Sequence, residues 1–126
     1  MSRLLLCAAL LTTLVSCNLV TGERTCTTEF RFGLAVFVKD SATGIGAASG
    51  ATLVTVDQHG SVDSTALPPN RTDLDPTAIY GAGEHAGTFV VTVRKPGYRD
   101  WVRSGVKVTS DGCHVRLTTI TALLQR

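Results

Sequence analysis

The 126-residue chain is poor in aromatic residues and in clustered charge. Only 6% of its residues are aromatic, which argues against a carbohydrate-binding platform, since such a platform needs several rings. Its 12 basic residues are nearly balanced by 10 acidic ones and are scattered along the chain. Nucleic-acid binding depends on clustered Lys and Arg that neutralise phosphates, so we expect no nucleic-acid partner.

Motifs that would mark catalytic chemistry are also absent from the sequence. The chain has no Gly-x-Ser-x-Gly, no His-Glu-x-x-His and no phosphate-binding loop. Gly44-Ile45-Gly46 and Gly81-Ala82-Gly83 each begin a glycine-rich run, but the spacing is wrong for a dinucleotide site and a strand pattern follows. We therefore expect no cofactor, no catalytic residues and no enzymatic activity.

No hydrophobic run is long enough to span a bilayer. Arg3 precedes an uncharged run of twelve residues from Leu4 to Val15, whereas a spanning helix needs roughly 20 apolar residues. A short run of this kind is typical of a secretory signal. Leu14-Val15-Ser16-Cys17 resembles the lipobox of bacterial lipoproteins. The resemblance implies that Cys17 is lipidated on sulfur, for instance with palmitate, and becomes the new N-terminus; the alternative is an ordinary signal with an incidental Cys.

These features divide the chain into three parts. We expect a signal peptide over 1–16, a lipidated tether over 17–25 and one domain over 26–126. An anchor of two or three acyl chains is effectively permanent at about 0.8 kcal/mol per methylene. Asn18, rather than Asp, follows Cys17, which by resemblance to Gram-negative lipoproteins implies the outer membrane, facing the periplasm. The tether reaches at most about 25 to 30 Å, so we expect the domain to lie near the bilayer.

Two cysteines remain in the expected domain, Cys26 at its start and Cys113 near its end. The envelope is a compartment that permits disulfides. A metal or redox pair would require near neighbours, as in Cys-x-x-Cys. We therefore predict that Cys26 and Cys113 form a disulfide.

Alternating hydrophobic residues indicate β-strands. The clearest patterns are Phe30–Lys39 and Thr88–Arg94, and Pro96-Gly97 after the second predicts a turn. We expect one buried face from Phe30, Phe32, Leu34, Val36 and Val38, and another from Phe89, Val91 and Val93.

Shorter strand patterns occupy the rest of the chain. We expect strands over Ala51–Val56, with the register open, Ser61–Leu67, Thr77–Tyr80, Tyr98–Arg103, from Val106 with Val108, and over Cys113–Leu124. The hydrophobic parity of the last stretch changes, which predicts a bulge near Thr118 or Thr119. About seven short strands without a helix predict an all-β fold, an antiparallel immunoglobulin-like or prealbumin-like sandwich.

Several turn and strand motifs occur in an order that resembles one family. They are a Cys before the first strand, a strand ending in Val38-Lys39-Asp40-Ser41-Ala42-Thr43-Gly44, Gly50-Ala51-Thr52-Leu53-Val54, the stretch Tyr80–Gly87, Pro96-Gly97-Tyr98 and a late Cys. In this order they resemble carboxypeptidase regulatory-like domains, which have a prealbumin-like sandwich fold. The resemblance implies a non-catalytic binding or structural module, including domains that stand alone on bacterial lipoproteins.

One group of residues is a candidate contact surface. Tyr98, Arg99, Trp101 and Arg103 combine aromatic rings with guanidinium groups that can stack on a sugar, a peptide or a partner protein. This predicts an envelope protein or a glycan as partner, the glycan alternative being a carbohydrate-binding module. In the alternative interpretation, Tyr98 packs under the Pro-Gly turn and Trp101 covers an edge of the sandwich.

A metal site is a second alternative. Glu84 and His85, together with Asp57 and His59 or with Asp111 and His114, would supply ligand types that metals prefer and would make the protein a small metal-assisted hydrolase. Three convergent ligands are required, however, and neighbouring residues on a strand or turn often diverge. We therefore expect no metal and interpret these side chains as solvated turn residues.

Overall fold

The computed structural model describes Gly22 and residues 24–69 and 75–126. The predicted signal peptide and the lipidation residue Cys17 lie outside the described residues. The described part contains seven strands, which are β1 (Phe32–Asp40), β2 (Thr52–Asp57), β3 (Val62–Ala66), β4 (Ala78–Gly83), β5 (Gly87–Arg94), β6 (Trp101–Val108) and β7 (Thr118–Leu124). No helix within it is long and apolar enough to cross a membrane.

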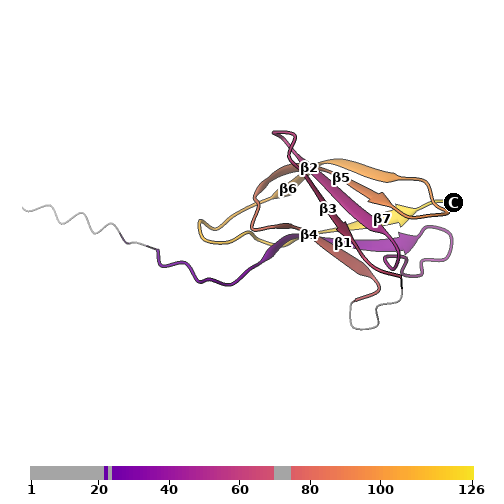
Figure 1. Ribbon diagram of the computed structural model, residues 1–126, viewed down its shortest axis with the longest axis horizontal. Helices are drawn as coiled ribbons and strands as arrows, with labels where there is room; N and C mark the ends of the chain where they lie inside the picture. Colours follow the sequence, from indigo (N-terminus) through magenta and orange to yellow (C-terminus); the bar gives the residue numbers. More distant parts are fainter. Residues whose placement is uncertain (1–21, 23, 70–74) are drawn as a thin grey trace, which may run out of the picture.

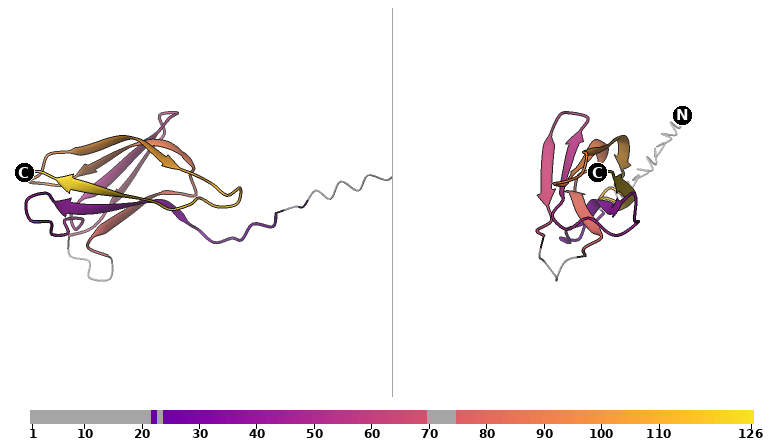
Figure 2. Two further views of the ribbon diagram at one scale, coloured as in Figure 1. Left: turned by 180° about the vertical axis from the view of Figure 1, so that it is seen from behind. Right: turned by 90° about the vertical axis from the view of Figure 1, so that its right-hand side faces the viewer.

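The strands form two sheets that pack face to face (Figures 1 and 2). One sheet has the order β4-β1-β7 and the other has the order β3-β2-β5-β6. This arrangement confirms the predicted all-β sandwich. Neighbouring strands are antiparallel except for β1 and β7, which pair in parallel from Leu34 opposite Thr118 to Asp40 opposite Leu124.

The core lies between the two sheets and contains most of the side chains predicted to be buried. Leu34, Val36 and Val38 of β1 and Val91 and Val93 of β5 are each 0% exposed, and Phe89 is 3% exposed. In β2 the structure settles the register, because Leu53, Thr55 and Asp57 are buried while the residues between them are only half-buried.

The start of β1 differs from the prediction that Phe30 and Phe32 belong to the core. Phe30 is 62% exposed and Phe32 is 43% exposed. The cause is Gly33, which is buried and lies so close to Val108 and to the carbonyl oxygen of Ala82 that no side chain would fit there. Gly33 and Leu34 are both buried, so the two-residue alternation of β1 is interrupted at Gly33, and the ring of Phe32 lies beside Tyr80 rather than with Leu34 in the core.

Strand β6 is also different from the sequence interpretation, which divided it into two strands. It runs without a break from Trp101 to Val108, but Val91 pairs with Arg103 whereas Phe89 pairs with Val106. One extra residue is therefore inserted in β6, and Gly105 adopts a positive φ of 71° at this bulge. The bulge brings Val106 and Val108 to the buried side.

The predicted strand from Cys113 and its bulge near Thr118 or Thr119 are wrong. Strand β7 begins only at Thr118, and its pairing with β1 continues from Thr118 to Leu124 without a shift. Residues 111–117 instead form a loop closed by an isolated bridge between Ser110 and Val115. The change in parity arises because the two halves of the stretch belong to different local structures.

The two ends of the sandwich are distinguished by the chain terminus that lies at each. The N-terminal segment runs into β1 at one end, and the C-terminus lies at the opposite end, near the turn that follows β1 (Figure 1). We call these the tether end and the far end. The disulfide lies at the tether end and the Pro96-Gly97 turn lies at the far end.

Candidate functional site

Tyr98, the first residue of the predicted contact surface, belongs to a polar network at the far end. Its hydroxyl donates to Asp40 Oδ2 at 2.7 Å and accepts from Arg126 Nη2 at 3.1 Å. The ring of Tyr98 is half-buried and packs against the core, with the guanidinium of Arg126 5.1 Å from its centroid. Tyr98 therefore connects the end of β1 to the turn after β5. This agrees with the alternative interpretation, in which Tyr98 packs under the Pro-Gly turn.

Asp40 is the acceptor at the centre of this network. It is 6% exposed, and its other oxygen, Oδ1, accepts the amide hydrogens of Ala42 at 2.9 Å and Thr43 at 3.1 Å. The hydrogen bond from Tyr98, followed by that from Thr43, lowers the pKa of Asp40 from 3.8 to about 2. This lowering stabilises the fold fully above the unfolded value of 3.8, and the contribution is lost as the pH falls through about 2.

Arg99 and Trp101 lie at the seam where the edge strand of one sheet approaches the edge strand of the other. The amide of Arg99 donates to the carbonyl oxygen of Gln125 at 2.8 Å and so joins the start of β6 to the chain after β7. A surface hollow of about 390 Å³ is lined there by Arg99, Asp100, Trp101, Val102, Leu123 and Gln125. The half-buried Trp101 packs against the core along one side.

Arg103, the last predicted contact residue, is exposed on β6 and is not among the residues that line this hollow. The structure therefore brings Arg99 and Trp101 together but assigns Tyr98 to the Asp40 network. The four residues do not form one surface.

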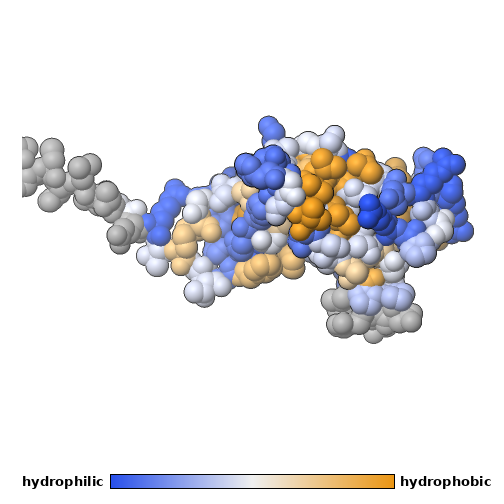
Figure 3. Space-filling model, turned by 45° about the horizontal axis from the view of Figure 1, so that its top comes forward, coloured by the Kyte–Doolittle hydropathy of each residue, from blue (hydrophilic) through white to orange (hydrophobic). Residues whose placement is uncertain are grey.

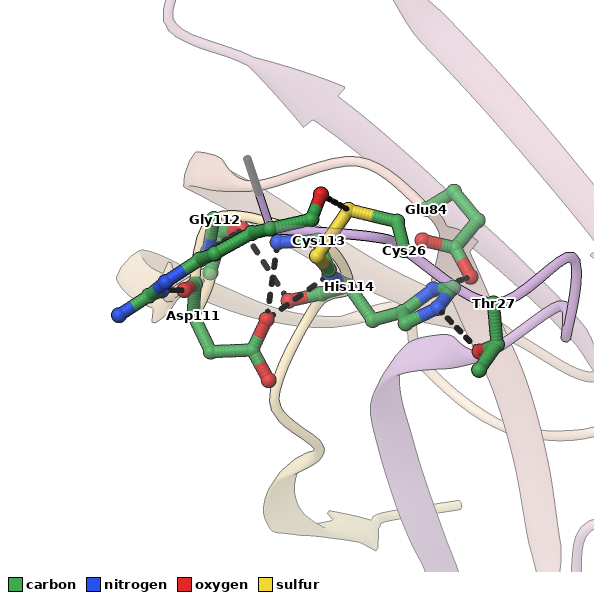
Figure 4. Close-up of a disulfide and its surroundings, with 9 residues drawn as sticks. Cys26, Thr27, Glu84, Asp111, Gly112, Cys113 and His114 are labelled. Carbon is green, nitrogen blue, oxygen red and sulfur yellow. Dashed lines mark hydrogen bonds and ion pairs between the residues drawn. A yellow bond between two sulfur atoms is a disulfide. The ribbon is translucent and has the colours of Figure 1, made fainter. Parts of the chain in front are cut away.

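At the tether end the predicted disulfide is confirmed. Cys26 and Cys113 are bonded, with their Cα atoms 5.2 Å apart (Figure 4). Asp111 shapes the loop that presents Cys113, because its Oδ1 accepts the amide hydrogens of both Cys113 and His114 at 2.9 Å. These bonds, led by that from His114, lower the pKa of Asp111.

Three side chains beside the disulfide form a connected line that sequence reasoning missed. His114 Nδ1 lies 2.9 Å from Glu84 Oε1, and His114 Nε2 lies 2.9 Å from the hydroxyl of Thr27 (Figure 4). Because a carboxylate only accepts, Nδ1 carries a hydrogen, and in the neutral ring Nε2 accepts from Thr27. His114 is 8% exposed, so these bonds are largely shielded from water.

Glu84 is held firmly in this line. Its Oε1 also accepts the amide hydrogen of Arg31 at 2.6 Å, and its backbone has a positive φ of 49°. Partial burial raises the pKa of Glu84, but the hydrogen bonds from His114 and Arg31 outweigh it and leave that pKa below its ordinary value. Together with the disulfide, the contacts of Thr27 and Arg31 fasten the N-terminal segment to the loops at the tether end.

The order carboxylate, imidazole, hydroxyl is also that of a nucleophilic triad. Here Thr27 follows Cys26 directly and lies on the segment that the disulfide fixes. The line of Glu84, His114 and Thr27 therefore connects this segment to two distant parts of the chain, and we call it together with the disulfide the N-terminal clamp.

His85 turns away from Glu84 and pairs with a different residue. Its Nε2 lies 3.1 Å from Asp57 Oδ2, and its ring packs edge-on against Phe89 with the centroids 5.4 Å apart. Asp57 accepts the amide hydrogens of Ser61 and His59 through Oδ1, and these bonds, led by that from Ser61, lower its pKa. Glu84 and His85 thus belong to separate pairs.

The metal alternative gains no support from this geometry. Among the residues that the structure describes, no three His, Cys, Asp or Glu side chains gather into a group that could hold a metal ion. The neighbouring candidates Glu84 and His85 diverge, as expected for adjacent residues at a turn.

A further surface feature lies on the outer side of the four-stranded sheet. We call it the valine face, and it consists of Val54, Val56, Val62, Val90 and Val102 from four strands (Figure 3). Val56 pairs across the sheet with both Val62 and Val90, and Thr92 pairs with both Val54 and Val102. Val62 is 65% exposed, Val102 59% and Val90 41%.

Comparisons with known proteins give no relative for the chain. No family model matches it, and neither the curated proteins nor the solved structures contain a match. Functional residues are therefore assigned from the chain's own contacts and exposure.

Proposed function

We propose that the protein is a lipid-anchored β-sandwich of the bacterial cell envelope that binds a partner protein and is not an enzyme. The anchor is Cys17, and the proposed location is the outer membrane, facing the periplasm. The lipobox-like sequence before Cys17 supports the anchor. The disulfide between Cys26 and Cys113 agrees with an oxidising compartment. The motif order and the two-sheet fold support a relationship with carboxypeptidase regulatory-like domains.

The observation that carries the binding function is the valine face. Across this face, valine and threonine side chains of neighbouring strands lie side by side, and Val56 lies between Val62 and Val90. Exposed apolar area is unfavourable by about 25 cal/mol per Å², and contiguous patches on monomers are often functional. A flat row of β-branched side chains suits packing against another sheet, at a spacing of about 10 Å.

The chemistry of this face favours a protein over a glycan as partner. Valine side chains offer neither ring faces for stacking nor hydrogen-bonding groups for sugar hydroxyls. A glycan docked there would lose hydrogen bonds to water without replacement. An apolar protein surface loses none and gains from the area it buries.

The experiment places a charge in the middle of the valine face. Val90→Lys is expected to weaken the complex with the envelope partner at least tenfold, or about 1.4 kcal/mol, because an unpaired ammonium would be buried. Ile45→Lys is the control, since Ile45 is 68% exposed in the turn after β1 and belongs neither to the valine face nor to the hollow beside Trp101. Partners would be cross-linked in native membranes and identified by mass spectrometry, and affinities measured with the purified partner.

The outcomes separate the possible occupants of the valine face. A partner lost with Val90→Lys and kept with Ile45→Lys supports the proposal. A cross-link between two copies of this chain that Val90→Lys abolishes would identify the partner as a second copy. Equal recovery of every partner with both variants, each melting like the unchanged protein, would contradict the function proposed for this face.

The hollow beside Trp101 supports a second candidate, a carbohydrate-binding module. Arg99, Asp100 and Gln125 provide polar groups beside the ring of Trp101, a combination that suits sugars. Loss of retention on cell-wall glycan in Trp101→Ala, but not in Val90→Lys, would support this candidate. Unchanged retention in Trp101→Ala would rule out the hollow as a glycan site.

A further inference from the structure

A second exposed apolar group lies at the tether end, on the sheet opposite to the valine face. It contains Phe30, Phe32, Tyr80 and Leu117, and we call it the tether-end cluster. The rings of Phe30 and Phe32 are 5.1 Å apart and those of Phe32 and Tyr80 are 5.6 Å apart. Their residues are 62%, 43% and 36% exposed, and Leu117 is 55% exposed. Three of the seven aromatic residues of the chain are thus gathered on one surface.

The backbone at this end holds the cluster outward. A side chain at Gly33, next to Phe32, would collide with Val108 and with the carbonyl oxygen of Ala82, and a side chain at Gly83 would occupy the space that the ring of Phe30 fills. Tyr80 alternates with the buried residues Ile79 and Gly81 on β4, so its ring points away from the core. A side chain at either glycine would therefore disturb the backbone or the ring beside this cluster.

Polar and charged groups border the rings. A hollow of about 480 Å³ is lined by Glu29, Arg31, Phe32, Tyr80, Val115, Arg116 and Leu117. Arg31 pairs with Glu29 at 2.9 Å, and Arg116, a second arginine of this lining, is exposed. Aromatic rings beside arginine suit the boundary between lipid headgroups and acyl chains, where a ring buries its apolar body and arginine reaches phosphate.

The N-terminal clamp brings this cluster close to the proposed anchor. The disulfide fixes Cys26 to Cys113, and Thr27 and Arg31 are held by His114 and Glu84. Between Cys17 and Cys26 the chain spans at most about 30 Å when fully extended. Beyond Cys26 the chain continues directly into Phe30 and Phe32, so these rings are held at the end of the sandwich nearest the anchor.

We propose that the tether-end cluster lies on the bilayer surface, with Phe30, Phe32, Tyr80 and Leu117 among the lipid headgroups. This inference rests on the proposed lipid anchor. The contact orients the domain so that the β4-β1-β7 sheet faces the membrane. The valine face, on the outer side of the other sheet, then points away from the bilayer and is accessible to a partner.

The test uses tryptophan fluorescence, because Trp101 is the only tryptophan of the chain. Phe30→Trp in a Trp101→Phe background is compared with the unchanged protein on vesicles of phosphatidylethanolamine and phosphatidylglycerol with brominated acyl chains. The fluorescence of Phe30→Trp is expected to fall at least twofold relative to the same vesicles without bromine. Trp101 is expected to keep its intensity, since it lies on the other sheet.

The same comparison is made on a chain attached without the natural lipid. The segment from Asn18 contains the disulfide and every core residue, and an N-terminal polyhistidine tag would hold it on vesicles containing nickel-chelating lipid. Quenching of Phe30→Trp on this segment supports the membrane contact even if Cys17 proves unlipidated and the proposed anchor fails. No quenching of Phe30→Trp on the tagged segment, or quenching equal to that of Trp101, would overturn the inference.

Discussion

Removing the disulfide is expected to lower the free energy of unfolding by about 4 to 5 kcal/mol in the chain-entropy model. Cys26 and Cys113 are 87 residues apart in sequence, so the bond closes most of the domain into one loop of the unfolded chain. The measurement is urea and thermal unfolding of the double variant Cys26→Ser and Cys113→Ser. For a domain of this size the melting temperature should fall by about 15 °C or more.

A matched control distinguishes the bond from the substitutions. The unchanged protein in reductant should melt like the double variant, and reductant should not affect the variant. The N-terminal segment is then held by the hydrogen bonds of Thr27 to His114 and of the Arg31 amide to Glu84, so amide exchange should accelerate most near Thr27, which is next to the lost bond. A double variant that melts with the unchanged protein would contradict the stabilising role of this bond.

Leu34→Ala is expected to lower the free energy of unfolding by about 3 kcal/mol, within a range of roughly 2 to 5 kcal/mol for buried leucines. Leu34 is 0% exposed on β1, the middle strand of the β4-β1-β7 sheet. The truncation leaves a cavity facing the second sheet that the rigid core fills only in part.

Leu123→Ala provides the control for that cavity. Leu123 is 52% exposed on β7, so the same truncation there should change the free energy of unfolding by no more than about 0.5 kcal/mol. Both variants would be measured by urea unfolding at one temperature. Equal losses at the two positions would show that Leu34 is not at the centre of the core.

The sequence was sufficient to predict the fold class because burial in a sandwich has a period of two residues. Phe89, Val91 and Val93 alternate with more polar residues and are all buried in β5. The same pattern located most of β1, and the positions of Cys26 and Cys113 predicted their bond. Local alternation does not determine which strands pair, so the parallel contact between β1 and β7 followed only from the structure.

Where the prediction of strands failed, the cause was a glycine or a turn that changed the parity. Gly33 is buried against Val108 and next to the buried Leu34, and Phe32 before it is 43% exposed although the alternating hydrophobic pattern continues through Phe32. In β6, the bulge at Gly105 adds one residue between Arg103 and Val106, and the side chain of Val106 is therefore buried. A hydrophobic pattern does not show whether a glycine faces a crowded core or open solvent.

The candidate sites depended on contacts between residues distant in the chain. Thr27 and His114 are 87 residues apart, and Glu84 lies 30 residues from His114. The sequence instead drew attention to neighbours such as Glu84 and His85, whose side chains point to different partners. The valine face was missed because its members belong to four strands whose order in the sheet was not predicted.

The most direct test of the central claim, that the domain is anchored by lipid at Cys17, is the mass of the mature N-terminal peptide. The protein would be isolated from bacterial membranes, digested, and its N-terminal peptide sequenced by mass spectrometry, with Cys17→Ser as the control. We expect a peptide that begins at Cys17 and carries two or three acyl chains, and we expect Cys17→Ser to lack it and to leave the membrane fraction. A mature chain with an unmodified Cys17, or with its first residue elsewhere, would contradict the account.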